Sequence, residues 1–364
     1  MRRQVNGMFR SLGFLLLFFV AFASAQPKDL ARPVVNDDGS VVVPEHVMPM
    51  SNYLNHDSQA YLLEHLRDMQ APSRLEQIEG VPVFMQHYLQ RQHELLGVKP
   101  NVRRINGVEV FDYAGTETPL KSKRDKVLIN LHGGGFMGCW PACAELESMP
   151  LAARGYRVIS INYRQHPGHR FPAASEDVAN VYQALLSDYA PENIGIYGCS
   201  AGGMLTSMSV AWFHKHQIPL PGAIGVLCAG VGLAPGGFGG DSVYTTAVAG
   251  EARNPPIYPA SAKNRFVLPY LRDTDITDPL VSPLYHPDYL RAFPPTLLVS
   301  GTRATELSNV VYSHSQLIKH GVDAHLHIWE GMFHGFFYNI EVEESSEYLD
   351  VIDNFFTKYL GKKT

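Results

Sequence analysis

The hexapeptide "GCSAGG" (198–203) directly follows a short apolar run, "NIGIY" (193–197), and precedes a segment with helical spacing. It fits the pattern G-x-S-x-G, whose glycines permit a sharp turn from a strand into a helix and so expose the Ser oxygen. The pattern alone is common in a chain with many glycines, but its position between a strand and a helix is specific. We therefore expect Ser200 to be a nucleophile and the N–H of Ala201, at the start of the helix, to face a developing oxyanion.

A second glycine-rich turn, "HGGGF" (132–136), follows the apolar run "KVLINL" (126–131). Consecutive glycines let backbone N–H groups approach a ligand closely, which a second oxyanion donor requires. Such a turn alone is also typical of a flexible loop. The two motifs in this order predict an active site, with Gly133 and Gly134 as further oxyanion donors.

From about residue 105 onward, short apolar runs that end in Gly or polar turns alternate with segments of helical spacing. The runs are "KVLINLHGGG" (126–135), "YRVISINYR" (156–164), "NIGIYGCS" (193–200), "AIGVLCAG" (223–230), "PTLLVSG" (295–301) and "AHLHIWEG" (324–331). Helical spacing is clearest over 174–189 and 342–360. We expect each run to be a strand buried on both faces. This alternation predicts an α/β fold with a mostly parallel central sheet and helices on both faces.

Two segments depart from this alternation. Residues 46–98 are rich in Met, His and Leu with helical spacing, and residues 231–272 are rich in Gly, Pro and Tyr. We expect both to form a helical cap over the carboxyl edge of the sheet, where ligands bind in such folds. The expected organisation is an N-terminal segment that forms part of the cap (26–104) and a main domain (105–364) with a cap insertion near 231–272.

The first 25 residues are typical of a secretory signal. Three arginines and no acidic residue accompany the apolar run "LGFLLLFFVAF" (12–22), and small residues lead to a cleavage point after Ala25. This run is too short to span a bilayer comfortably. We therefore expect a cleaved signal, no stable membrane anchor, and a periplasmic or secreted protein.

The net charge of the chain indicates that nucleic acid is not its partner. Removal of residues 1–25 takes the formal net charge from −5 to −8, because three arginines and no acid are lost. The remaining chain has no basic run and no stripe of alternating aromatic and basic residues. We therefore expect a small-molecule partner rather than a polyanion.

Four cysteines occur, Cys139, Cys143, Cys199 and Cys228. An exported chain meets oxidising conditions. Two alternatives therefore remain: a disulfide between Cys139 and Cys143, or cysteines that are buried as free thiols. No second Cys/His pair accompanies them, so the spacing is not a metal pattern, and we expect neither a metal nor a cofactor. The oligomeric state is also open, with a homodimer among the alternatives.

Five motifs of this chain resemble those of the hormone-sensitive lipase-like family of α/β-hydrolase esterases, in the family's order. They are "HGGGF" (132–136), "YRQHPGHRFPAASED" (163–177), "GCSAGG" (198–203), "DPLVSPL" (278–284) and "GMFHGF" (331–336). The resemblance covers about 105–360 and implies the α/β-hydrolase fold with the nucleophile and oxyanion donors given above. The family commonly has Asp where this chain has Cys199, a modest departure.

His334 is the expected general base, both by the resemblance and by its position. It follows the last core strand in a loop flanked by glycines, before the final helix, so it can lean over the sheet edge towards Ser200. It also completes the order Ser, acid, His that is expected of this fold.

The third member of a catalytic triad, the acid, is where this chain departs from the family pattern. The family places an Asp where this chain has Ala304, in "SGTRATELS" (300–308), and Ala cannot orient an imidazole. Glu306 is the nearest carboxylate and our candidate acid. Three alternatives remain: a solvated Glu306 in the first turn of the next helix, a carboxylate from elsewhere (Asp278 being a poor substitute), or no functional acid.

The leading expectation is a serine carboxylesterase that hydrolyses short-chain or small aryl esters through an acyl-enzyme. The alternative is a catalytically weakened homologue that binds a ligand, because the acid position is Ala304.

Overall fold

The computed structural model describes residues 32–44, 47–78, 81–114, 123–233, 240–249 and 268–362. The chain divides into two compact units, Met1–Pro49 and Met50–Thr364. In the first, β1 (Val34–Val35) and β2 (Val41–Val42) form an exposed antiparallel pair. The secretory signal expected over residues 1–25 lies outside the described residues.

The second unit is built on an eight-stranded sheet in the order β12-β11-β10-β9-β7-β8-β6-β5. Its strands are β5 (Asn101–Ile105), β6 (Val108–Tyr113), β7 (Val127–Leu131), β8 (Arg157–Ile161), β9 (Ile194–Cys199), β10 (Ala223–Leu227), β11 (Thr296–Gly301) and β12 (Ala324–Trp329), and a separate short pair is β3 (Gln77–Ile78) with β4 (Val81–Pro82). The strands β7 to β12 are parallel to one another, and β6 runs antiparallel to both of its neighbours, β8 and β5. All six strands expected from the apolar runs are present, so the mostly parallel sheet is confirmed.

Two features of the sheet differ from expectation. The expectation that every strand is buried on both faces is wrong for β12, which is half-buried along its whole length because it lies at the sheet edge. The hairpin of β5 and β6 was not expected. Most of β5 is exposed and carries Arg103 and Arg104, so no apolar run marks it in the sequence.

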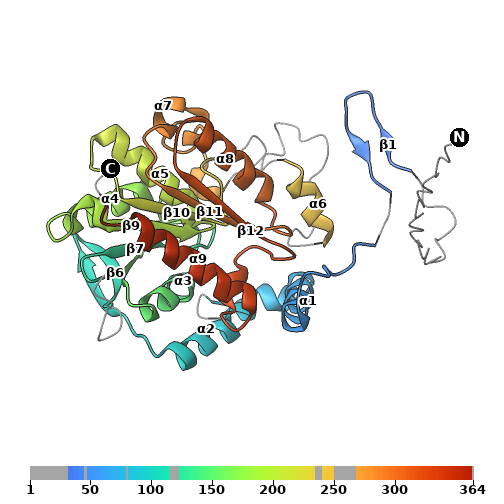
Figure 1. Cartoon of the computed structure of the whole chain (residues 1–364), viewed down its shortest axis with the longest axis horizontal. Coiled ribbons are helices and arrows are strands. Elements are labelled where there is room, and N and C mark those ends of the chain that lie inside the picture. The colour runs from blue at the N-terminus through green and yellow to red at the C-terminus, as the bar shows by residue number, and fades with distance from the viewer. Residues whose placement is uncertain are drawn as a thin grey trace, which may run out of the picture. The chain divides into compact units, whose positions relative to one another are not determined.

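Helices cover both faces of the sheet (Figure 1). They are α1 (His56–Gln70), α2 (Val83–Leu96), α3 (Ala142–Ala153), α4 (Ala173–Leu185), α5 (Ala201–His216), α6 (Ser242–Ala249), α7 (Pro287–Leu290), α8 (Leu307–Lys319) and α9 (Glu343–Tyr359). Neighbouring residues of β7 show the two faces. Ile129 packs in one apolar cluster with α4, α5 and α8, and Leu128 packs in another with α1, α2, α3 and α9.

The helices expected over 174–189 and 342–360 correspond to α4 and α9. No helix within the described ranges combines the length and the apolar character that a membrane crossing requires. Helices α1 and α2 account for most of the expected cap segment 46–98. Much of 231–272 lies outside the described residues.

Candidate active site

Ser200 lies at the tight turn between the end of β9 and the start of α5. Its φ is 58° and its ψ −122°, a backbone conformation that a non-glycine residue rarely adopts and that the surrounding structure must enforce. A side chain at Gly202 would overlap the carbonyl of Leu131 on β7, so only glycine lets α5 start this close to the sheet. The turn directs Ser200 into a cavity, as the motif predicted.

The cavity has a volume of about 480 Å³ and a mainly apolar wall. Its described wall includes Tyr61, His65, Met69, Phe84, Met85, Tyr88, Gly134, Gly135, Met137, Cys139, Cys143, Ser200, Ala201, Met204, Leu268, Thr305, Phe333, His334 and Tyr338. Helices α1 and α2 thus contribute to the wall opposite the sheet edge, where a cap was expected. The volume lies within the range of pockets that enclose small ligands.

The turn "HGGGF" presents its second and third glycines to this cavity, not its first two. Gly134 and Gly135 line the cavity with Ser200. The N–H of Gly133 instead donates to Oε1 of the buried Glu147 at 3.0 Å. The assignment of Gly133 as an oxyanion donor is therefore wrong, and Gly135 takes its place as a candidate. Gly134 has a φ of 110°, where an added side chain would also overlap the carbonyl of Gly138.

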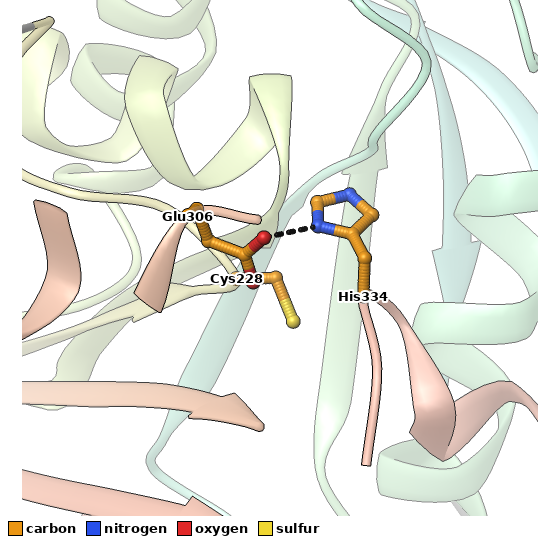
Figure 2. Close-up of side chains that lie close together, drawn as sticks. All are labelled: Cys228, Glu306 and His334. Atoms are coloured by element: carbon orange, nitrogen blue, oxygen red, sulfur yellow. Dashed lines mark hydrogen bonds and ion pairs between the residues drawn. The ribbon is translucent and has the colours of Figure 1, made fainter. Parts of the chain in front are cut away.

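His334 and Glu306 come together at the cavity, although they are 28 positions apart in the sequence. Oε2 of Glu306 lies 3.1 Å from Nδ1 of His334 (Figure 2). Its Oε1 accepts a hydrogen bond from the hydroxyl of Ser300 at 3.0 Å. Glu306 occupies the N-cap position of α8 without a capping bond from its side chain, and it is fully buried, so the alternative of a solvated side chain is wrong. Ala304 is also buried, and Asp278 instead accepts the N–H of Leu280 at 2.8 Å within its own turn.

A second buried carboxylate, Glu147 on α3, lies behind the glycine-rich turn. Besides the N–H of Gly133, it accepts the side-chain amide of Asn130 at 2.9 Å and the hydroxyl of Tyr338 at 3.0 Å. The backbone of Cys199, next to the nucleophile, is a further donor. Burial raises the pKa of Glu147 to about 7, although these hydrogen bonds act in the opposite direction. One carboxylate therefore connects the oxyanion turn, the serine turn and the cavity wall.

Glu147, Tyr338 and His65 belong to the site but lie in none of the motifs that predicted it. For Glu147, the only signal is its helical spacing of four from Cys143 and from Leu151, which places it on an apolar face. His65 lies on α1 and its ring stacks on Phe333 with 3.6 Å between the ring centres.

The cavity wall near His334 is kept uncharged by burial. Burial, together with a smaller effect of the nearby His334, lowers the pKa of His65 to about 3, so the His65 ring is neutral at neutral pH. Cys139 and Cys143, whose pairing was open, form a disulfide that lines the cavity between the glycine-rich turn and α3.

Comparison with known proteins places these features in context. Residues 128–338 match the family model described as alpha/beta hydrolase fold. An acetyl-hydrolase of Streptomyces hygroscopicus is 28% identical over 242 residues, which cover 66% of this chain and 76% of that protein. The carboxylesterase/phospholipase LipF of Mycobacterium tuberculosis is 30% identical over 245 residues, which cover 64% of this chain and 59% of that protein.

Solved structures are similar over most of the chain. The crystal structure of an esterase E25 superimposes with a TM-score of 0.74 at 26% identity and covers 88% of this chain and 99% of its own. An esterase from the bacterial hormone-sensitive lipase family superimposes with a TM-score of 0.69 at 24% identity, covering 85% and 99%. The expected α/β-hydrolase fold is confirmed.

Proposed function

Because this chain belongs to the alpha/beta hydrolase fold family, we propose that it cleaves short-chain or small aryl esters with Ser200 as the nucleophile. The relationship to hormone-sensitive lipase-like esterases that its motifs implied is confirmed, and the chain is a carboxylic ester hydrolase. The serine mechanism and the size of the substrate are the parts that we propose.

In the first step, the Oγ of Ser200 attacks the ester carbonyl and His334 takes its proton. A base needs a partner that fixes its ring and stabilises the imidazolium that forms. The carboxylate of Glu306, 3.1 Å from Nδ1 of His334, supplies that partner. The hydroxyl of Ser300 donates to the other carboxylate oxygen of Glu306 and so fixes the orientation of this carboxylate.

The negative charge that develops on the carbonyl oxygen is held by backbone N–H groups of Gly134, Gly135 and Ala201. The first two line the cavity, and Ala201 begins α5, so its N–H has no partner within the helix. His334 then returns its proton to the leaving alcohol. Water, activated by the same base, hydrolyses the acyl-enzyme and releases the acid.

One observation carries this proposal: Ser200 and His334 line one cavity, and a buried carboxylate is bonded to the His334 ring from behind. The alternative of a weakened ligand-binding homologue rested on Ala304. It is not favoured, because Glu306 brings a carboxylate to His334 from a position two residues further along the loop.

A fluorophosphonate probe and a chromogenic ester test the proposal together. We expect stoichiometric labelling of the wild-type chain, turnover of p-nitrophenyl acetate, and neither in Ser200→Ala. Labelling of Ser200 without turnover would instead support the ligand-binding alternative.

We also propose that the protein is exported. The leader pattern of residues 1–25 supports this proposal, and so does the disulfide between Cys139 and Cys143, a bond that persists in oxidising compartments. Sequencing the N-terminus of the mature protein should give Gln26 as the first residue. An intact leader on active protein in the cytosol would contradict it.

A further inference from the structure

The thiol of Cys228 lies beside the pair formed by Glu306 and His334 (Figure 2). It is buried, it is in the reduced form, and it is not part of the cavity wall, so the reaction makes no use of it. One ligand atom of each of the three residues lies within 4.8 Å of the other two. Thiolate, imidazole and carboxylate are the three kinds of ligand that zinc takes from proteins.

The spacing of these atoms is close to that of a zinc site. Bonds of about 2.0–2.1 Å to nitrogen and oxygen place two such atoms about 3.3 Å apart on a tetrahedral ion. Nδ1 of His334 and Oε2 of Glu306 are already 3.1 Å apart. A point amid three atoms no more than 4.8 Å apart is at most about 2.8 Å from each, so shifts of no more than about 0.5 Å for sulfur and about 0.8 Å for nitrogen and oxygen complete the bonds.

Charge and outer contacts favour an ion at this point. A thiolate and a carboxylate together neutralise a divalent cation, which a buried site requires. The hydroxyl of Ser300 holds the second oxygen of Glu306 at 3.0 Å. The N–H of Gly335 donates to Sγ of Cys228 at 3.4 Å, a contact that a thiolate strengthens. Metal ligands in proteins are commonly oriented by such contacts.

We infer that Cys228, Glu306 and His334 bind one Zn²⁺ or a similar thiophilic divalent cation. The ion enters from the cavity past His334, whose side chain is 30% exposed, and a water molecule takes the fourth position. Binding releases one proton, that of the thiol, to the solvent, and the neutral ring keeps its single proton, which moves from Nδ1 to Nε2.

The bound ion inhibits hydrolysis. With Nδ1 of His334 bound to the cation, Glu306 no longer stabilises an imidazolium, and the adjacent positive charge makes the ring a poor base. Binding itself is independent of the proposed function, whereas the inhibition rests on it.

Zinc chloride added to the full mature chain tests both parts. We expect p-nitrophenyl butyrate turnover to fall and to recover with EDTA, while Mg²⁺, which prefers oxygen ligands, has no effect. Cys228→Ser should keep its uninhibited activity, since a hydroxyl can also accept the N–H of Gly335. The zinc concentration for half-inhibition should rise at least about tenfold in this variant, because a hydroxyl is a far weaker zinc ligand than a thiolate.

Cys199→Ser is the matched control: Cys199 is the other buried free cysteine of the described chain, and a serine hydroxyl can keep its side-chain hydrogen bond to Cys228, so the inhibition should be unchanged. Co²⁺ provides a readout without activity: the wild-type chain and Cys199→Ser should show thiolate-to-cobalt absorption, and Cys228→Ser should not. Cys228→Ala, checked for cooperative thermal unfolding, replaces the serine variant if that one fails to fold. Equal inhibition in the wild type and both Cys228 variants, or no difference in cobalt absorption, would overturn the inference.

Discussion

Glu147 and Glu306 are both buried carboxylates behind the active site, but they have different partners. Glu147, on α3, accepts hydrogen bonds from neutral groups: the N–H of Gly133, the amide of Asn130 and the hydroxyl of Tyr338. Glu306, at the start of α8, faces the imidazole of His334 at 3.1 Å. The first carboxylate contacts groups that do not react, and the second contacts a ring that must carry a charge during the reaction.

This difference separates two ways in which a buried charge serves a catalytic site. Glu147 fixes the geometry of a backbone turn, and burial raises its pKa to about 7. In the proposed mechanism, Glu306 stabilises a charge that appears only in the transition state, so it acts on the rate of the chemical step. Replacing either carboxylate by its amide should therefore have effects of very different size.

Ser200→Ala sets the scale for this comparison. We expect kcat for p-nitrophenyl acetate to fall by about 10⁶-fold, because loss of the nucleophile removes the acyl-enzyme route. The melting temperature should change little, since a small side chain at the turn contributes little packing. A variant that keeps most of its activity would show that Ser200 is not the nucleophile, and neither carboxylate would then act as described.

Glu306→Gln should have the next largest effect. An amide has the shape of the carboxylate but cannot stabilise imidazolium, and loss of the triad acid typically lowers kcat by about 10⁴-fold. We expect KM to change little, because Glu306 does not line the cavity. Steady-state kinetics on one short ester measure both constants, and Glu306→Asp, which keeps the charge, should retain more activity than the amide.

The dependence of kcat/KM on the length of the acyl chain tests the size of the cavity beside the two carboxylates. The proposed preference for acetyl or butyryl esters rests on a cavity of about 480 Å³ to whose wall α1 and α2 contribute. We expect kcat/KM to fall by about 100-fold or more between butyrate and palmitate p-nitrophenyl esters, since each misplaced methylene removes binding free energy. Comparable rates on the sixteen-carbon ester would contradict a size-limited pocket.

Glu147→Gln should have the smallest effect on the rate. An amide can still accept the N–H of Gly133 through its oxygen, so the oxyanion turn is loosened rather than lost. We expect kcat to fall by about tenfold, from a weakened hydrogen bond to a charged group. A loss as large as that of Glu306→Gln would remove the distinction between the two carboxylates.

The same variant predicts a pH dependence of stability. The folded chain binds the Glu147 proton more tightly than the unfolded chain, because the pKa is raised from 4.5 to about 7. The free energy of unfolding of the wild type, relative to Glu147→Gln, should therefore fall by on the order of 3 kcal/mol as the pH rises from about 4.5 to 7, and then level off. Urea unfolding of both proteins across this range measures it, and parallel curves would show that Glu147 does not titrate there.

Much of the fold followed from local patterns. The six apolar runs became β7 to β12, because strands buried by flanking helices need an apolar residue at nearly every position. Strand β5 gave no such signal, since it lies at the sheet edge where charged residues such as Arg103 are solvated, and β6 beside it has only a short alternation of apolar and polar residues.

The residues of the site also divide into those that the sequence predicted and those that it did not. Ser200 and His334 were identifiable because their motifs require particular backbone turns. Gly133 was assigned wrongly because adjacent glycines are equivalent in the sequence. Only the position of Glu147 and the φ of Gly134 determine which N–H faces the cavity. Such three-dimensional contacts arise between segments far apart in the chain.

The most direct test of the central claim, that Glu306 supplies the carboxylate that Ala304 lacks, is kcat of Ala304→Asp measured beside that of Glu306→Gln. Our account predicts that Ala304→Asp leaves kcat nearly unchanged or lowers it, because His334 already has a carboxylate at 3.1 Å and Ala304 is buried. It also predicts the loss of about 10⁴-fold in Glu306→Gln. A silent Glu306→Gln together with an Ala304→Asp variant that is faster by orders of magnitude would contradict it.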